Sequence, residues 1–173
     1  MIQKSSKRFL IITADDYGAS KNINEGIKYA AEKKAITTIF VLTNFQESLS
    51  GLKEISDNHP KIGIGVHLNI VTGKPILNPE QIPSLIGFED NFYPFDKLLL
   101  KIYSISIDDL RNELRAQIQA LQRNNIKIDH LTDQCGILSL FSPFYDVVME
   151  LAQEFNVPLR SPLIASVKYP GLF

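Results

Sequence analysis

Residues 8–20 read RFLIITADDYGAS, an apolar run that leads directly into two neighbouring carboxylates, Asp15 and Asp16. The run from Phe9 to Thr13 predicts a short buried strand, which places both acids at its end. Adjacent carboxylates repel each other, so the presence of two side by side calls for a structural or functional explanation. It is either a loop turn before a helix whose N-cap is Ser20, or part of a metal site, because a cation would offset the repulsion.

Strand and helix patterns alternate along the rest of the chain. Apolar, β-branched runs predict further strands at Ile36–Leu42, Ile62–Ile70 and Ile126–Leu131, and the start of a fifth strand at Val157–Leu159. Helical apolar spacing predicts helices at Ile23–Lys34, Gln46–Asn58, Asp108–Asn124 and Pro143–Phe155. This alternation predicts a parallel sheet with crossover helices, and hence an α/β fold.

Two segments depart from the regular pattern. The strand Ile62–Ile70 carries Gly63 and Gly65 at alternate positions, which indicates close approach of another part of the chain. Thr72–Phe95 is a long connection rich in proline, and long loops in compact domains tend to be lids or binding loops.

Composition limits the classes of function. The chain has 173 residues, 45% of them hydrophobic, and a net charge of −1, so we expect one domain over residues 1–173. Balanced charge gives no sign of a nucleic-acid or membrane partner. No apolar run reaches the roughly 18 residues that span a bilayer, and the N-terminal residues lack the apolar region of a secretory signal. With one cysteine, Cys135, we expect a cytoplasmic protein without an internal disulfide.

Chemistry in such folds collects at the carboxyl ends of the parallel strands. The polar residues at those ends are Asp15, Asp16, Thr43, Asn44, His67, Asn69, Thr132, Asp133 and Gln134. Aspartate and histidine suit a divalent ion, and one aspartate of the pair would then act as base on an attacking water. Taken singly, His67 could be a core histidine and Asp129–His130 a surface strand end. Cys135 is interpreted as a small buried apolar group.

Three motifs occur in order from Phe9 to Pro162: TADDYG, GVHLNIVTGKPIL, and IDHLTDQCG followed by SPFYDVVMELAQEFNVPLRSP. They resemble the YdjC-like carbohydrate deacetylases. The resemblance implies a (β/α) barrel, a divalent metal (Mg²⁺ or Zn²⁺), and hydrolysis of N-acetyl groups on small amino-sugar oligosaccharides. It also implies Asp15 as catalytic base and Asp16 and His67 as metal ligands. Gln134 stands where the family pattern D-H-L-D-S-H-H has its third ligand, so it is the remaining candidate.

A full barrel needs on the order of 250 residues. We therefore expect an incomplete barrel that lacks the family's C-terminal part and self-associates through exposed strand edges. One alternative is a relative that binds metal or sugar without turnover, because Gln134 replaces a histidine. A more distant alternative is a receiver domain, which also ends its first strand with acids but needs an aspartate at the end of its third strand.

Overall fold

The structure, a computed structural model, describes residues 9–160. Four parallel strands form one sheet in the order β1 (Thr13–Tyr17), β2 (Thr38–Val41), β3 (Gly63–Leu68) and β4 (His130–Asp133). Beyond β4, Leu159 pairs with Leu131 through a single parallel bridge. Within residues 9–160, the expected fifth strand is therefore seen as this single bridge.

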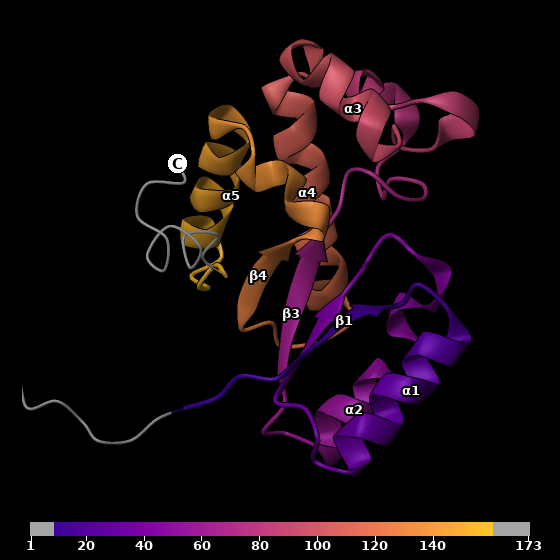
Figure 1. The fold of residues 1–173 in the computed structure, drawn as a ribbon, viewed down its shortest axis with the longest axis vertical. Coiled ribbons are helices and arrows are strands. Elements are labelled where there is room, and N and C mark those ends of the chain that lie inside the picture. The colour runs from indigo at the N-terminus through magenta and orange to yellow at the C-terminus, as the bar shows by residue number, and fades with distance from the viewer. Residues whose placement is uncertain (1–8, 161–173) are drawn as a thin grey trace, which may run out of the picture.

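Residues 9–160 contain five α-helices (Figure 1). Four of them lie between consecutive strands: α1 (Lys21–Glu32), α2 (Leu52–Asn58), α3 (Phe95–Lys101) and α4 (Ile107–Arg123). The fifth, α5 (Ser142–Glu154), follows β4. The strands follow one another around the sheet in chain order, as in a barrel, and the sheet is not closed. The prediction of an incomplete, barrel-like α/β fold is confirmed. In a receiver domain the first strand lies between the second and the third. Here β2 lies between β1 and β3, so a receiver-like fold is excluded.

The apolar core lies between the sheet and its helices, and α1 and α2 contribute buried side chains to it as well as α4 and α5. Strand side chains alternate between the two faces of a sheet, so Ile39, Val41, Ile64 and Val66 all contribute to this core. From α4, a single stripe of fully buried side chains faces them: Leu110, Leu114, Ile118 and Leu121. Spacing of three and four residues puts this stripe on one side of the helix. Within residues 9–160, no helix has the length and apolar character needed to cross a membrane.

The predicted first strand is displaced along the chain. Strand β1 begins at Thr13, which pairs with Thr38, and it contains both aspartates rather than ending before them. The side chains of Phe9, Leu10 and Ile11 are exposed, so the prediction that Phe9–Thr13 is buried is wrong. Backbone pairing starts at Ile12, whose carbonyl accepts hydrogen bonds from the amides of Thr37 and Thr38.

Two further boundaries differ from the predicted ones. The helix predicted at Gln46–Asn58 is a 3₁₀ turn, Gln46–Leu49, and then α2, since Gly51 between them has a φ of 72° that a helix cannot continue through. The strand predicted at Ile126–Leu131 begins later, at His130, because ladder bonding starts where the Asp129 amide donates to the Ile64 carbonyl.

On the face of the sheet opposite the helices, a row of contacting polar side chains runs from Asp129 and His130 to Thr38 of β2. It passes over the glycines of β3. The Asp129 carboxylate contacts His130 Nδ1, and His130 Nε2 lies 2.9 Å from Thr38 Oγ1. A Cβ at Gly65 would lie 2.3 Å from the His130 ring, and one at Gly63 would lie 2.8 Å from the Asp129 carboxylate. The alternate glycines therefore allow a close approach, as predicted, and Asp129–His130 is not merely a surface strand end.

Candidate functional site

The turn around Asp16 is shaped by β1 itself. The pairing of β1 with β2 shifts register between Ala14 and Tyr17, and Asp16 has a φ of 65°, a value that residues other than glycine rarely adopt. Next to it, the buried Tyr17 hydroxyl donates to the Ser50 carbonyl. Gly18 has a φ of 103°, and a Cβ there would lie 2.8 Å from the Ser48 backbone. The TADDYG motif thus encodes a strained strand end that turns the Asp16 side chain inward.

Asp16 and His67 meet at the carboxyl ends of β1 and β3. Asp16 Oδ1 lies 3.5 Å from His67 Nδ1. Both atoms are buried, and neither has a hydrogen-bond partner among the described residues. A third such atom is Thr43 Oγ1, just beyond β2. Buried polar atoms are nearly always paired, so unpaired atoms at three neighbouring strand ends indicate a place for a ligand.

The surroundings of His67 favour a neutral imidazole. Burial lowers the pKa of His67, while the neighbouring Asp16 and Asp15 carboxylates and a backbone hydrogen bond with Asp133 act in the opposite direction. The side chain is only 6% exposed. A neutral ring nitrogen is the form that binds a metal ion.

Asp15 lies beside a basic residue that the sequence patterns did not single out. The Arg160 guanidinium, one residue past the bridge at Leu159, approaches the Asp15 carboxylate at 3.9 Å and also stacks over the Phe40 ring. Both charged side chains are about half exposed. Arg160 directly follows the segment Val157–Leu159, where a fifth strand was expected to start. The rule that functional residues lie just beyond strand ends would have singled it out if it had been applied to this segment.

The end of β4 is organised differently. The Asp133 carboxylate accepts hydrogen bonds from the Leu138 amide (3.1 Å) and from both the amide and the hydroxyl of Ser139 (2.8 and 2.9 Å). Burial raises the pKa of Asp133, against the effect of these hydrogen bonds. Asp133 is therefore held by the 3₁₀ segment Gln134–Ser139, and it is not free to replace a missing ligand. Gln134 begins this segment and is partly buried.

Cys135 is exposed, which corrects the interpretation of a buried apolar group. Partial desolvation raises the pKa of its thiol, and the carboxylates of Asp16 and Asp133 raise it further. A thiol beside two carboxylates is poorly ionised, and only the thiolate is a good nucleophile. Nucleophilic catalysis by Cys135 has no support in this environment.

Asn44 and Asn69, the other polar residues at the rim, hold the long loop. Asn69 Oδ1 accepts from the Val71 and Thr72 amides, while Asn69 Nδ2 donates to the Asn44 side chain and to the Thr72 carbonyl. Asn44 Nδ2 donates to the carbonyls of Thr72 and Lys74. These amides shape the wall of the site and have their hydrogen bonds satisfied within the protein.

Two buried residues of α4 complete that support. Gln117 exchanges hydrogen bonds with the backbone of Asn69, and the Glu113 carboxylate accepts from the amides of Ile76 and Leu77. Burial raises the pKa of Glu113. Sequence reasoning missed both, because polar residues on an amphipathic helix are expected on its solvent side.

The Asp16–His67 pair fits a divalent cation in spacing and chemistry. Two ligands at about 2.1 Å from one tetrahedral ion lie about 3.4 Å apart, close to the 3.5 Å between Asp16 Oδ1 and His67 Nδ1. Among residues 9–160, however, no group of three or more histidine, cysteine, aspartate or glutamate side chains is placed to hold an ion. Within residues 9–160, the candidate for a third ligand is therefore the neutral side chain of Gln134.

Together, the sheet and the rim define a barrel-type α/β protein with an aspartate–histidine site at the carboxyl ends of its strands. The chain belongs to the YdjC-like protein family, whose family model matches residues 9–170. It is 32% identical over 164 residues to a carbohydrate deacetylase of Clostridium beijerinckii, and 32% identical over 153 residues to one of Halalkalibacterium halodurans. These matches cover 94% and 88% of the chain.

A solved structure has the same fold. The chain superimposes with a TM-score of 0.80 and 28% identity on a protein of Enterococcus faecalis named as a proposed cellobiose-phosphate cleavage protein. The match covers 94% of the chain and 62% of that protein. The chain likewise spans 64% and 63% of the two deacetylases, less than two thirds of their length.

Proposed function

We propose that the protein is a metal-dependent hydrolase that removes N-acetyl groups from amino-sugar oligosaccharides. The observation that carries the proposal is the pair of buried, unpartnered atoms, Asp16 Oδ1 and His67 Nδ1, beside the accessible carboxylate of Asp15. The names of the deacetylase relatives support the substrate class.

Asp16 and His67 would hold Mg²⁺ or Zn²⁺, with Gln134 as the third candidate ligand. When bound, such an ion polarises the amide carbonyl and stabilises the charge that develops on its oxygen. Asp15 takes a proton from the attacking water, whose oxygen bonds to the carbonyl carbon. The carbon–nitrogen bond then breaks as the leaving nitrogen takes the proton that Asp15 accepted, and the free amine and acetate are released. Asp15 is 43% exposed, which lets it reach a bound substrate.

Arg160 is a positioning residue in this scheme. Its guanidinium lies 3.9 Å from the Asp15 carboxylate and over the Phe40 ring. The ionic attraction is modest at this exposure, so Arg160 would favour one direction of the carboxylate without holding it rigidly.

The test is acetate release from N-acetylglucosamine oligomers with Mg²⁺ or Zn²⁺. General-base catalysis contributes about 10²–10⁴-fold, so Asp15→Asn should lower the rate by that factor while metal affinity is kept. Asp57→Asn changes an exposed aspartate of α2 and should keep the rate. Acetate release that survives Asp15→Asn would contradict the assigned base.

A second candidate is a relative that binds metal or sugar without turnover. Gln134 at the third ligand position favours it, because an amide oxygen is a weak ligand for zinc-like ions. Calorimetric binding of metal, with no acetate released by the wild-type protein, would favour this candidate over the deacetylase.

A further inference from the structure

Three rings from neighbouring strands contact one another in sequence: His67 of β3, Phe40 of β2 and His130 of β4. The centroids of the Phe40 and His130 rings lie 4.6 Å apart, with the rings at 77°, and those of Phe40 and His67 lie 5.9 Å apart, with the rings at 53°. Edge-to-face contacts at such distances are favourable for aromatic rings. Phe40 is buried, so its ring links His67 to His130 inside the protein.

Gly65 makes this contact across three strands possible. In the sheet, Phe40 pairs with Gly65, and Gly65 pairs with His130. Side chains at paired positions lie on the same face of a sheet, so a side chain on β3 would separate the two rings. A Cβ at Gly65 would overlap the His130 ring. The missing side chain therefore lets rings from β2 and β4 meet over β3.

The His130 ring is held at both of its nitrogens. The Asp129 carboxylate contacts Nδ1, and Thr38 Oγ1 lies 2.9 Å from Nε2. Thr38 is itself fixed, because its buried hydroxyl donates to the Gly63 carbonyl at 3.2 Å. Rotation of the His130 ring would break both of its contacts. His130 therefore presents a rigid edge to Phe40.

The His67 ring has partners of a different kind around it. Its Nδ1 lies 3.5 Å from Asp16 Oδ1, and the backbone of Asp133 forms a hydrogen bond with the ring. Both of these contacts are made at ring nitrogens. Phe40 supplies an apolar contact with the ring itself. In metal sites, neighbours that orient a histidine ring contribute strongly to affinity.

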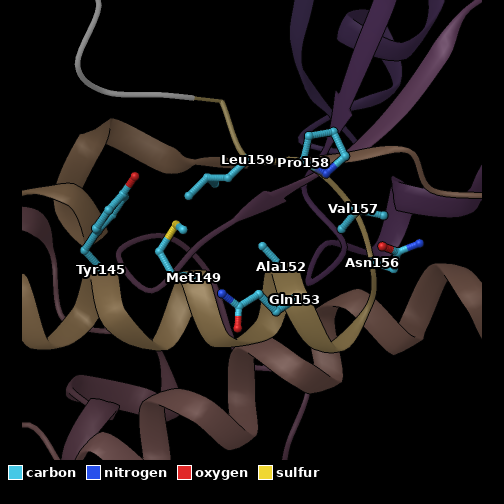
Figure 2. Close-up of a pocket in the computed structure, with 8 residues that line it drawn as sticks. All are labelled: Tyr145, Met149, Ala152, Gln153, Asn156, Val157, Pro158 and Leu159. Atoms are coloured by element: carbon cyan, nitrogen blue, oxygen red, sulfur yellow. The ribbon is translucent and has the colours of Figure 1, made fainter.

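Arg160 reaches the same Phe40 ring from the other side of β4. The segment Val157–Leu159 lies beside α5, as Figure 2 shows, and its backbone is tied to β4. The Leu131 amide donates to the Pro158 carbonyl, and the Arg160 amide donates to the Leu131 carbonyl, both at 2.9 Å. This places the Arg160 guanidinium 5.8 Å from the Phe40 centroid.

We propose that Phe40 and His130 are positioning residues that fix the orientation of the His67 ring. His130, locked at both nitrogens, holds the Phe40 ring, and the Phe40 ring in turn keeps His67 Nδ1 directed toward Asp16. The inference deepens the proposed function and rests on it for the role of His67 as a metal ligand. Because Phe40 also contacts Arg160, one ring supports both the candidate ligand and the residue beside the candidate base.

Calorimetric titration with Zn²⁺ tests the role of Phe40. Phe40→Leu should weaken Zn²⁺ binding by about tenfold, at the lower end of the 10–100-fold cost of losing a supporting neighbour. The matched control is Phe144→Leu, the same substitution at an equally buried ring of α5 (0% exposed, against 2% for Phe40). It should bind Zn²⁺ as the wild type does. Equal affinities in the two variants, both weakened or both unchanged, would overturn the proposal.

Gly65→Ala tests the role of His130. The added methyl group displaces the His130 ring, and Zn²⁺ affinity should again fall by about tenfold. Gly26→Ala is the control, because an added Cβ on this residue of α1 meets nothing within 4 Å. If Gly65→Ala does not fold, Thr38→Val removes the contact at His130 Nε2 without adding bulk and should weaken binding in the same way. Wild-type affinity in the folded variant would overturn the role of His130.

Histidine ring NMR signals of the metal-free protein separate this inference from the proposed function. His67 should give one sharp set of ring signals in the wild type and in Phe144→Leu. In Phe40→Leu the set should broaden or double, because the ring then samples more than one orientation. A wild-type protein that binds no Zn²⁺ would contradict the proposed function, and the spectra would still decide the positioning. One sharp set of His67 signals in Phe40→Leu would overturn it.

Discussion

At the ends of β1 and β3, Asp16 and His67 bury polar atoms that have no partner in the described structure. At the end of β4, by contrast, the Asp133 carboxylate accepts three hydrogen bonds from its own loop. Both regions place an aspartate at a strand end. Burial lowers the pKa of His67 in the first region and raises the pKa of Asp133 in the second. The two carboxylates differ in their hydrogen bonds. Asp133 has hydrogen-bond partners within the protein and supports the fold, whereas the buried oxygen of Asp16 has none among the described residues and is available to a ligand.

The sharpest test of this difference is His67→Ala. If Asp16 and His67 are the metal ligands, as proposed, removing one of them should weaken divalent-metal affinity by about 100-fold or more, because loss of even a supporting neighbour costs about 10–100-fold. Calorimetric titration with Zn²⁺ or Mg²⁺ measures the change. His59→Ala, in the turn after α2, is the control and should bind as the wild type does. Equal metal affinities in both variants would show that the metal does not bind at the ends of β1 and β3.

Asp133→Ala should show the opposite behaviour. It leaves the Leu138 and Ser139 amides without their acceptor, which should lower the free energy of unfolding by about 1–3 kcal/mol. Metal affinity should stay near the wild-type value. Urea unfolding gives the first quantity and titration the second. Asp16→Ala should lose affinity without that loss of stability, and the reverse result for the two aspartates would break the comparison.

Gln134→His should strengthen metal binding at the rim, where the amide of Gln134 is the weakest of the candidate ligands. An imidazole in place of an amide should raise Zn²⁺ affinity on the order of tenfold, which corresponds to about 1.4 kcal/mol. Gln119→His, on α4 away from the rim, is the matched control. If affinity is unchanged in both variants, the third ligand lies elsewhere.

Glu113 extends the comparison to pH, because it resembles Asp133 in being buried and bonded to backbone amides. Burial raises its pKa above the ordinary 4.5, so the folded state binds its proton more tightly than the unfolded state. Its contribution to stability is then present below pH 4.5 and is lost as pH rises through the folded-state pKa. Relative to Glu113→Gln, the wild type should lose up to about 1.4 kcal/mol per pH unit there. Denaturant midpoints at several pH values measure the slope, and parallel curves would contradict it.

Periodicity was sufficient for most of the fold. The stripe of Leu110, Leu114, Ile118 and Leu121 predicted α4, and the β-branched runs predicted β2 and β3, because these side chains are buried as the pattern requires. The first strand was misplaced for the converse reason. Phe9, Leu10 and Ile11 are as apolar as a buried strand, yet nothing within residues 9–160 covers them. A hydrophobic pattern shows that a segment tends to be buried, but it does not show which part of the protein covers it.

The site was predictable in position and less so in detail. Strand-end reasoning placed Asp15, Asp16, His67 and Gln134 at one rim, and the structure brings Asp16 and His67 within 3.5 Å. Their roles as ligands, and that of Gln134, stay predictions. The sequence could not show that Asp133 is occupied by its own loop, or that Arg160 reaches Asp15, because both depend on side-chain directions after long excursions of the chain.

The left-handed backbone of Asp16 has a consequence for how this protein would respond to selection. An L-residue at such a φ carries a cost of about 1 kcal/mol that glycine avoids, and here the residue also buries an oxygen without a partner. Selection of a mutant library for heat resistance alone should therefore enrich Asp16→Gly. Under the proposed function, adding growth on an acetylated sugar to the selection should restore aspartate. Stability and the proposed chemistry would then favour different amino acids at this position.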